Sequence, residues 1–143
     1  VTVLDAAGQP REVFRPGEDL VVALDLEAVE PVERPHLALG IWDGATRQPL
    51  ILASMLVDGL APAQLEGSCR LSCRFHAPPL MPRSYQVWGE VYAADRQTLL
   101  LRWQLLAAFG LADTHRQAHR EAGALRHARA DAPVRADYEW TIS

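Results

Sequence analysis

The 143-residue sequence lacks the features of several large protein classes. No window approaches the run of about 20 apolar residues that a membrane-spanning helix needs. There is no glycine-rich loop followed by a lysine, so we expect no bound nucleotide. The net charge of -4 offers no basic excess to displace the counterions of a nucleic acid. We therefore expect neither membrane insertion nor a nucleic-acid partner. The sequence begins at Val1, and we expect a domain boundary there rather than a secretory signal.

Cysteine is scarce, with only Cys69 and Cys73 present. They stand four residues apart in an alternating stretch, which in a strand separates them by about 13 Å on one face. A disulfide needs Cα atoms within about 7 Å, so the two cannot bridge. We predict that both are reduced and buried beside Leu71 and Phe75, as in a protein of a reducing compartment.

Motifs of common enzymes are missing too, including the G-x-S-x-G elbow, H-E-x-x-H and paired C-x-x-C. His115 and His119 have the spacing of two metal ligands on a helix, but arginines flank them and no third ligand is evident. The carboxylates Asp25 and Glu27 fall on the polar phase of a strand, where solvated charge is the ordinary interpretation. We expect no catalysis, no metal and no cofactor.

What the sequence does contain is turn residues every eight to twelve positions, separated by stretches of alternating apolar and polar residues. The predicted strands are 1–5, 12–15, 18–28, 36–43, 49–56, 66–76, 83–94, 97–109 and 134–141. This pattern predicts one all-β domain over 1–143, an immunoglobulin-like antiparallel sandwich of seven to nine strands, with a closed barrel as the alternative. Residues 110–132 are predicted as a loop or short helix, and 133–143 as a terminal strand.

Large aromatic residues occupy the polar phase of two predicted strands. In 36–43 the apolar phase excludes Trp42, and in 84–92 it excludes Trp88 and Tyr92. In an immunoglobulin-like sandwich these two strands are neighbours, so the three rings are expected on one outer surface. Trp103 is instead predicted in the core, because it shares the phase of neighbouring leucines.

An exposed aromatic surface calls for a partner. Sugar rings have apolar faces that stack on flat aromatic rings, while their hydroxyls bond to polar side chains nearby. The candidate polar residues are Gln86, Glu90, Arg102 and Gln104. The alternative is that a loop, an exchanged strand or a partner subunit covers the rings, which makes the chain a structural or dimerisation module without glycan binding.

Short motifs along the chain resemble those of one known family. They are DAAG at 5–8, FRPGEDL at 14–20, PHLALGIWDG at 35–44, LEG at 65–67, LMPRSY at 80–85 and YEW at 138–140. In this order they resemble the C-terminal carbohydrate-binding domain of Wzt-type proteins, the ATP-binding subunits of bacterial O-antigen ABC transporters. The sequence departs from the family pattern at Arg83-Ser84, where a glycine usually follows the proline, and 110–132 has no counterpart.

This resemblance implies a cytoplasmic domain, peripheral to the inner membrane, that recognises a lipid-carrier-linked polysaccharide, such as an O-antigen or its non-reducing terminus, before export. It further implies that an ATPase domain upstream, outside this sequence, contacts the membrane subunit of the transporter.

The C-terminal segment suggests a homodimer. A polar stretch of more than twenty residues follows Phe109, and Tyr138 to Ile142 then has strand-forming residues. A long connection lets the final strand pair with its own sheet or with that of a second copy. We predict dimerisation through this segment, with fold-back on its own domain as the alternative.

Overall fold

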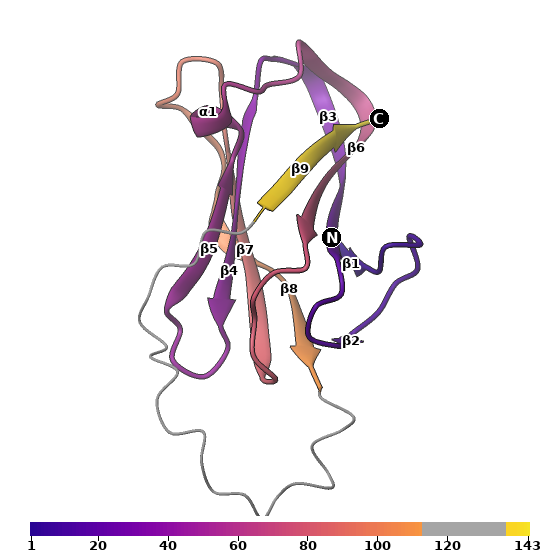
Figure 1. Ribbon diagram of the computed structural model, residues 1–143. Coiled ribbons are helices and arrows are strands. Elements are labelled where there is room, and N and C mark those ends of the chain that lie inside the picture. The colour runs from indigo at the N-terminus through magenta and orange to yellow at the C-terminus, as the bar shows by residue number, and fades with distance from the viewer. Residues whose placement is uncertain (113–136) are drawn as a thin grey trace, which may run out of the picture.

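The computed structural model describes residues 1–112 and 137–143, and its strands form two sheets packed face to face (Figure 1). One sheet has the order β1-β3-β6-β9 and the other the order β2-β8-β7-β4-β5. The elements are β1 (Thr2–Leu4), β2 (Val13–Phe14), β3 (Leu20–Glu33), β4 (His36–Asp43), β5 (Pro49–Ser54), α1 (Met55–Asp58), β6 (Gln64–His76), β7 (Ser84–Tyr92), β8 (Leu99–Leu111) and β9 (Asp137–Ile142). The predicted all-β sandwich is confirmed. The two separate sheets exclude a closed barrel.

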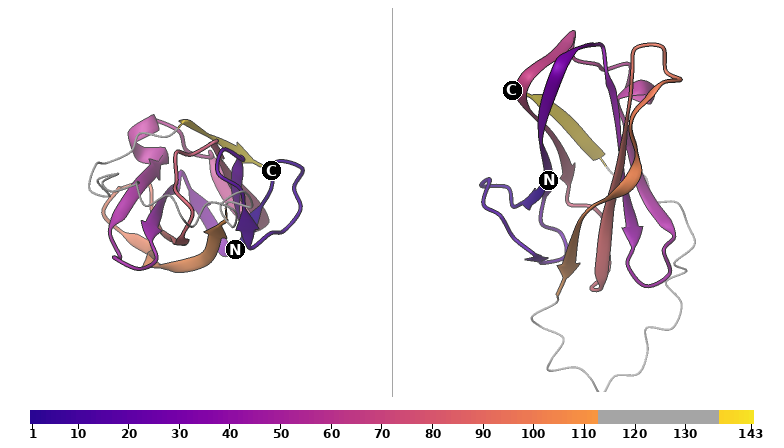
Figure 2. Two further views of the ribbon diagram at one scale, coloured as in Figure 1. Left: turned by 60° about the horizontal axis from the view of Figure 1, so that its bottom comes forward. Right: turned by 180° about the vertical axis from the view of Figure 1, so that it is seen from behind.

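The core lies between the two layers, which Figure 2 shows from one end and from behind. Alternation puts every second side chain of the long strands into this space. The contributors are Leu20, Val22 and Leu24 from β3, Leu71, Cys73 and Phe75 from β6, Leu37, Leu39 and Ile41 from β4, and Tyr85 and Val87 from β7. Neighbouring strands are antiparallel, except that the short β2 runs parallel to the end of β8.

The start of β7 is tied to the rest of the sandwich by two side chains. The hydroxyl of Tyr85 donates to the carbonyl of Met81 at 2.5 Å, an arrangement typical of immunoglobulin-like sandwiches at the corresponding strand. Arg83 donates to the buried carboxylate of Asp43, at the end of β4, at 2.6 Å. The first bond holds the segment before β7, and the second connects that segment to the end of β4.

The final strand β9 pairs with β6 of its own chain (Figure 1). Its inward aromatic side chains reach α1, where Tyr138 Oη donates to Asp58 Oδ1 at 3.0 Å and Trp140 Nε1 donates to Asp58 Oδ2 at 3.2 Å. Both oxygens of one carboxylate thus hold the strand. In the single chain β9 folds back on its own domain, which is the alternative to strand exchange. Exchange of β9 between two copies stays a prediction.

Several details differ from the sequence-based expectations, among them the end of β3, which reaches Glu33 rather than residue 28. The strand predicted to reach residue 56 ends at Ser54, whose hydroxyl accepts from the Val57 amide at 3.4 Å and begins α1. Cys73 is buried as predicted, but Cys69 is only half-buried; both are free thiols. The predicted loop or helix of 110–132 and the pair His115 and His119 lie, beyond residue 112, outside the described residues.

No helix in the described ranges is long and apolar enough to cross a membrane.

Candidate functional site: an aromatic outer face

The outer face of the five-stranded sheet carries the predicted aromatic side chains of β4 and β7. Pairing of β4 with β7 sets Gly40 opposite Trp88 and Trp42 opposite Gln86, and these positions face away from the core. Trp42 and Trp88 are both half-buried, with ring centroids 5.7 Å apart and planes tilted by 38°. The prediction that they share one surface is therefore confirmed.

Trp103 of β8 also belongs to this surface, so its predicted place in the core was wrong. Its ring centroid lies 6.1 Å from that of Trp42, and it is half-buried. The phase argument failed because the register of β7 with β8 shifts at three points. The shift between Gly89 and Val91, where β8 holds an extra residue, separates Trp103 from the phase of Leu101, and Leu99 and Leu105 are exposed as well. We call Trp42, Trp88 and Trp103 the tryptophan cluster.

Gly40 forms the floor under the tryptophan cluster. A Cβ atom at this position would lie 2.9 Å from Trp42 Nε1 and 3.0 Å from Trp103 Cη2. Both indoles therefore rest against the bare backbone of β4, and only glycine leaves room for them. The tryptophan of β8 reaches across β7 to do so.

An apolar row continues from the cluster to both sides of the sheet. Leu52 of β5 pairs with Gly40 and is 59% exposed, and Leu105 of β8 pairs with Trp88 and is 48% exposed. Four neighbouring strands thus contribute apolar surface at one level. A continuous apolar row on the outside of a sheet is unnecessary for folding and indicates a binding surface.

Gln86 orients the tryptophan cluster rather than standing free for a ligand. Its Oε1 atom accepts a hydrogen bond from Trp88 Nε1 at 3.1 Å. This bond satisfies the only polar group of that indole and fixes the ring plane on the sheet. The amide nitrogen of Gln86 is the part left to meet a hydroxyl.

Tyr92 lies at the end of the same face, opposite His36 of β4. Four residues of strand separate it from Trp88, about 13 Å, and among the described residues its ring pairs with none of the tryptophans. Loss of surrounding solvent, the charge of Glu90 and the hydrogen bond that Tyr92 donates to the Glu90 carboxylate all raise the pKa of Tyr92. The side chain of His36, which pairs with Tyr92 across the two strands, is buried. The Nδ1 atom of His36 has no hydrogen-bond partner among the described residues. The face therefore has an aromatic centre and a separate polar end.

The remaining predicted polar residues fall into two groups. Glu90 is half-buried on β7 between Trp88 and Tyr92, as predicted, and Arg102 is exposed on β8. Gln104 is exposed as well, but it pairs with Gly89. Gly89 faces the core, because a Cβ atom built there would lie against Leu39. Its register therefore separates Gln104 from the outer-face residues, and we remove it from the site.

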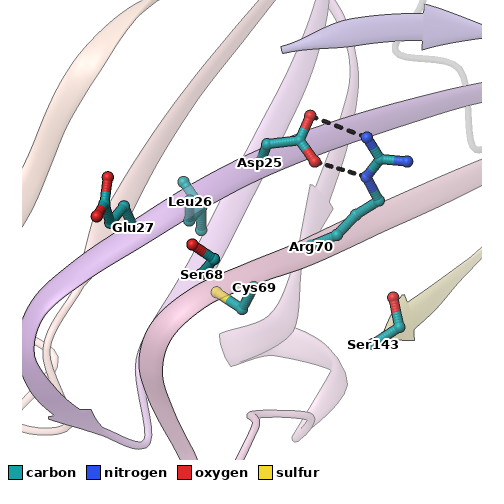
Figure 3. A pocket seen from close by; sticks show the side chains of 7 residues that line it. All are labelled: Asp25, Leu26, Glu27, Ser68, Cys69, Arg70 and Ser143. Atoms are coloured by element: carbon teal, nitrogen blue, oxygen red, sulfur yellow. Dashed lines mark hydrogen bonds and ion pairs between the residues drawn. The ribbon is translucent and has the colours of Figure 1, made fainter.

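The other sheet carries a hollow of about 510 Å³ lined by charged, polar and apolar residues of β3, β6 and the end of the chain (Figure 3). Asp25 and Arg70 face each other there in a two-pronged ion pair, with Nε to Oδ1 at 2.6 Å and Nη2 to Oδ2 at 3.0 Å. Cys69 and the C-terminal Ser143 complete one side. Asp25 and Arg70 satisfy each other and no aromatic ring lines the hollow, so it fits a glycan less well than the aromatic face.

In residues 1–112 and 137–143 no three His, Cys, Asp or Glu side chains gather in a group that suits a metal ion. The sequence matches no protein-family model, and comparison with curated proteins finds no relative. The functional argument therefore depends on the geometry of the outer face.

Proposed function

We propose that this chain is a non-catalytic carbohydrate-binding domain that recognises an exported bacterial cell-surface polysaccharide. The observation that carries the proposal is the tryptophan cluster on the outer face, seated on Gly40 and flanked by polar side chains. Flat apolar rings with hydrogen-bonding groups at their margins match the apolar faces and hydroxyls of sugar rings. The resemblance to Wzt-type C-terminal domains supports the same function and adds a setting: the cytoplasmic side of an ABC transporter, next to its membrane subunit.

A chain without catalysis agrees with the surroundings of the carboxylates. Hydrolysis of a glycosidic bond needs two carboxylates converging across a cleft. On the outer face the described acidic side chain beside the tryptophan cluster is Glu90 alone. We therefore propose binding without turnover.

The test is calorimetric titration against an array of neutral and acidic bacterial polysaccharides, using the wild-type chain and Trp88→Ala. We expect the substitution to weaken binding by about 5- to 150-fold, taking as the scale the value of about 1–3 kcal/mol found for stacking of a nucleic-acid base on an aromatic side chain. Val57→Ala, on an exposed α1 residue, is the control and should bind as the wild type does. Equal binding by Trp88→Ala would remove the tryptophan cluster from the site.

The second candidate function is a structural or dimerisation module, favoured by the exposed Leu52 and Leu105 beside the cluster. Protein partners also bury such apolar rows. Light scattering distinguishes the two: a dimer that Trp88→Ala dissociates would favour the interface. A wild-type chain that stays monomeric at high concentration would leave the interface without support.

A further inference from the structure

Two charged side chains, Glu90 of β7 and Arg102 of β8, lie at neighbouring positions of the five-stranded sheet. Glu90 pairs with Ala38 of β4 and lies between Trp88 and Tyr92 on β7. On its other side, the extra residue in β8 sets Arg102 and Trp103 together opposite Glu90. A carboxylate and a guanidinium thus stand on neighbouring strands next to the tryptophan cluster.

Neither charge forms an ion pair in the part of the chain that the structure describes, although the carboxylate of Glu90 accepts a hydrogen bond from Tyr92. Every ion pair within 4.0 Å among those residues joins other side chains. Glu90 is half-buried whereas Arg102 is exposed, so solvent and salt screen the carboxylate less than the guanidinium. The raised pKa of Tyr92, to which the charge of Glu90 contributes, is consistent with a negative potential at this point.

We propose that the outer face selects uncharged glycans, and that Glu90 is the residue that rejects acidic ones. This inference rests on the proposed glycan-binding function. Sugar hydroxyls suit both charges, because a carboxylate accepts from them and a guanidinium donates to them. An acidic sugar stacked on the tryptophan cluster would bring its carboxylate close to that of Glu90, and like charges in a partly buried site repel strongly.

A matched pair of probes tests the selectivity. The neutral array polysaccharide that binds best is oxidised at its primary hydroxyls, which adds carboxylates to an unchanged backbone. We expect the wild-type chain to bind the neutral form at least about tenfold more tightly, a difference of about 1.4 kcal/mol. Glu90→Gln removes the charge and keeps the shape, and we expect it to lower the neutral-to-oxidised affinity ratio by about tenfold.

Two further variants complete the design. Arg102→Gln removes the cation opposite Glu90 and should leave the ratio as high as in the wild type, or raise it. Glu66→Gln, on an exposed residue of the other sheet, lowers the net negative charge equally and should leave the ratio unchanged. Thermal unfolding of each variant shows whether it is folded.

The outcomes separate the two proposals. If the array yields only acidic ligands, or the wild type binds the oxidised form as tightly as the neutral one, the selectivity is refuted and the glycan-binding function stands. If Glu90→Gln is folded and its affinity ratio equals that of the wild type, Glu90 does not determine the selectivity. If no polysaccharide binds, both proposals are wrong.

Discussion

Asp43 ends β4 directly after Trp42, and its carboxylate connects the two strands that carry the aromatic face. The side chain is 2% exposed and accepts from the amides of Ala45 at 2.9 Å and Thr46 at 2.8 Å, and from Arg83 Nη1 at 2.6 Å. These donors hold the pKa of Asp43 at about 2, below its usual 3.8. A shift of this size corresponds to about 2 kcal/mol of folding free energy at neutral pH. We therefore expect Asp43→Asn, which keeps the shape and removes the charge, to lower the free energy of unfolding by about 2 kcal/mol.

The pH dependence provides a second check on the same residue. Because the pKa is lower in the folded state, the stabilisation is complete above the unfolded pKa of about 3.8 and is lost as the pH falls toward 2. Urea unfolding followed by tryptophan fluorescence should show a wild-type advantage over Asp43→Asn at pH 7 that disappears between pH 4 and 2.

The matched control for Asp43 is Asp95→Asn. Asp95 makes similar amide contacts, to Gln97 and Thr98, but in an exposed turn, so its replacement should destabilise the protein less. An advantage at pH 7 of under about 0.5 kcal/mol, the size of an ordinary surface substitution, would refute the argument. So would an advantage that persists at pH 2.

Three other expectations concern the floor of the face, the thiols and the C-terminal strand. Gly40→Ala places a methyl group 3.0 Å from the ring of Trp103. We expect it to lower the free energy of unfolding in urea by about 1–3 kcal/mol and to weaken glycan binding. An unchanged tryptophan emission spectrum would contradict the close packing. Burial raises the pKa of Cys73. A thiol reagent should therefore modify the half-buried Cys69 in the native protein and Cys73 only after unfolding. Equal reaction rates of the two thiols in the native protein would contradict the burial of Cys73. Light scattering should find a dimer for the full chain and a monomer for a chain truncated after Ala132, and two monomers would exclude the terminal segment as the dimer contact.

The positions of the aromatic residues on β4 and β7 were predictable because both strands alternate without interruption from end to end. An unbroken period of two assigns every side chain to a face, and the buried Leu37, Leu39 and Ile41 leave Trp42 outside. Tyr85, Val87 and Val91 do the same for Trp88. For these strands the free energy of burying one face is enough to fix which residues remain outside.

The helix α1 was missed, although its signals are local. Ser54 is a good N-cap, and Gly59, with φ of 68°, ends the helix in the left-handed conformation that glycine tolerates best. The apolar run from Leu50 to Leu56 masked these two residues, because a short apolar run fits a buried strand as well as a helix. The helix α1 matters because it carries Asp58, which binds two side chains of β9. These contacts join residues 80 or more positions apart, so no local sequence pattern could predict them.

The error at Trp103 shows where alternation stops being informative. The pairing of β8 with β7 shifts between Val87 and Trp88, between Gly89 and Val91, and between Val91 and Tyr92. Nothing in the residue pattern of 99–106 marks these positions. The shift between Gly89 and Val91 turns Trp103 outward, and the absence of a side chain at Gly40, two strands away, leaves room for its ring. It also sets Arg102 opposite Glu90. The composition of the site thus depends on one irregular strand, whose register is determined by packing across the sheet rather than by its own residue pattern.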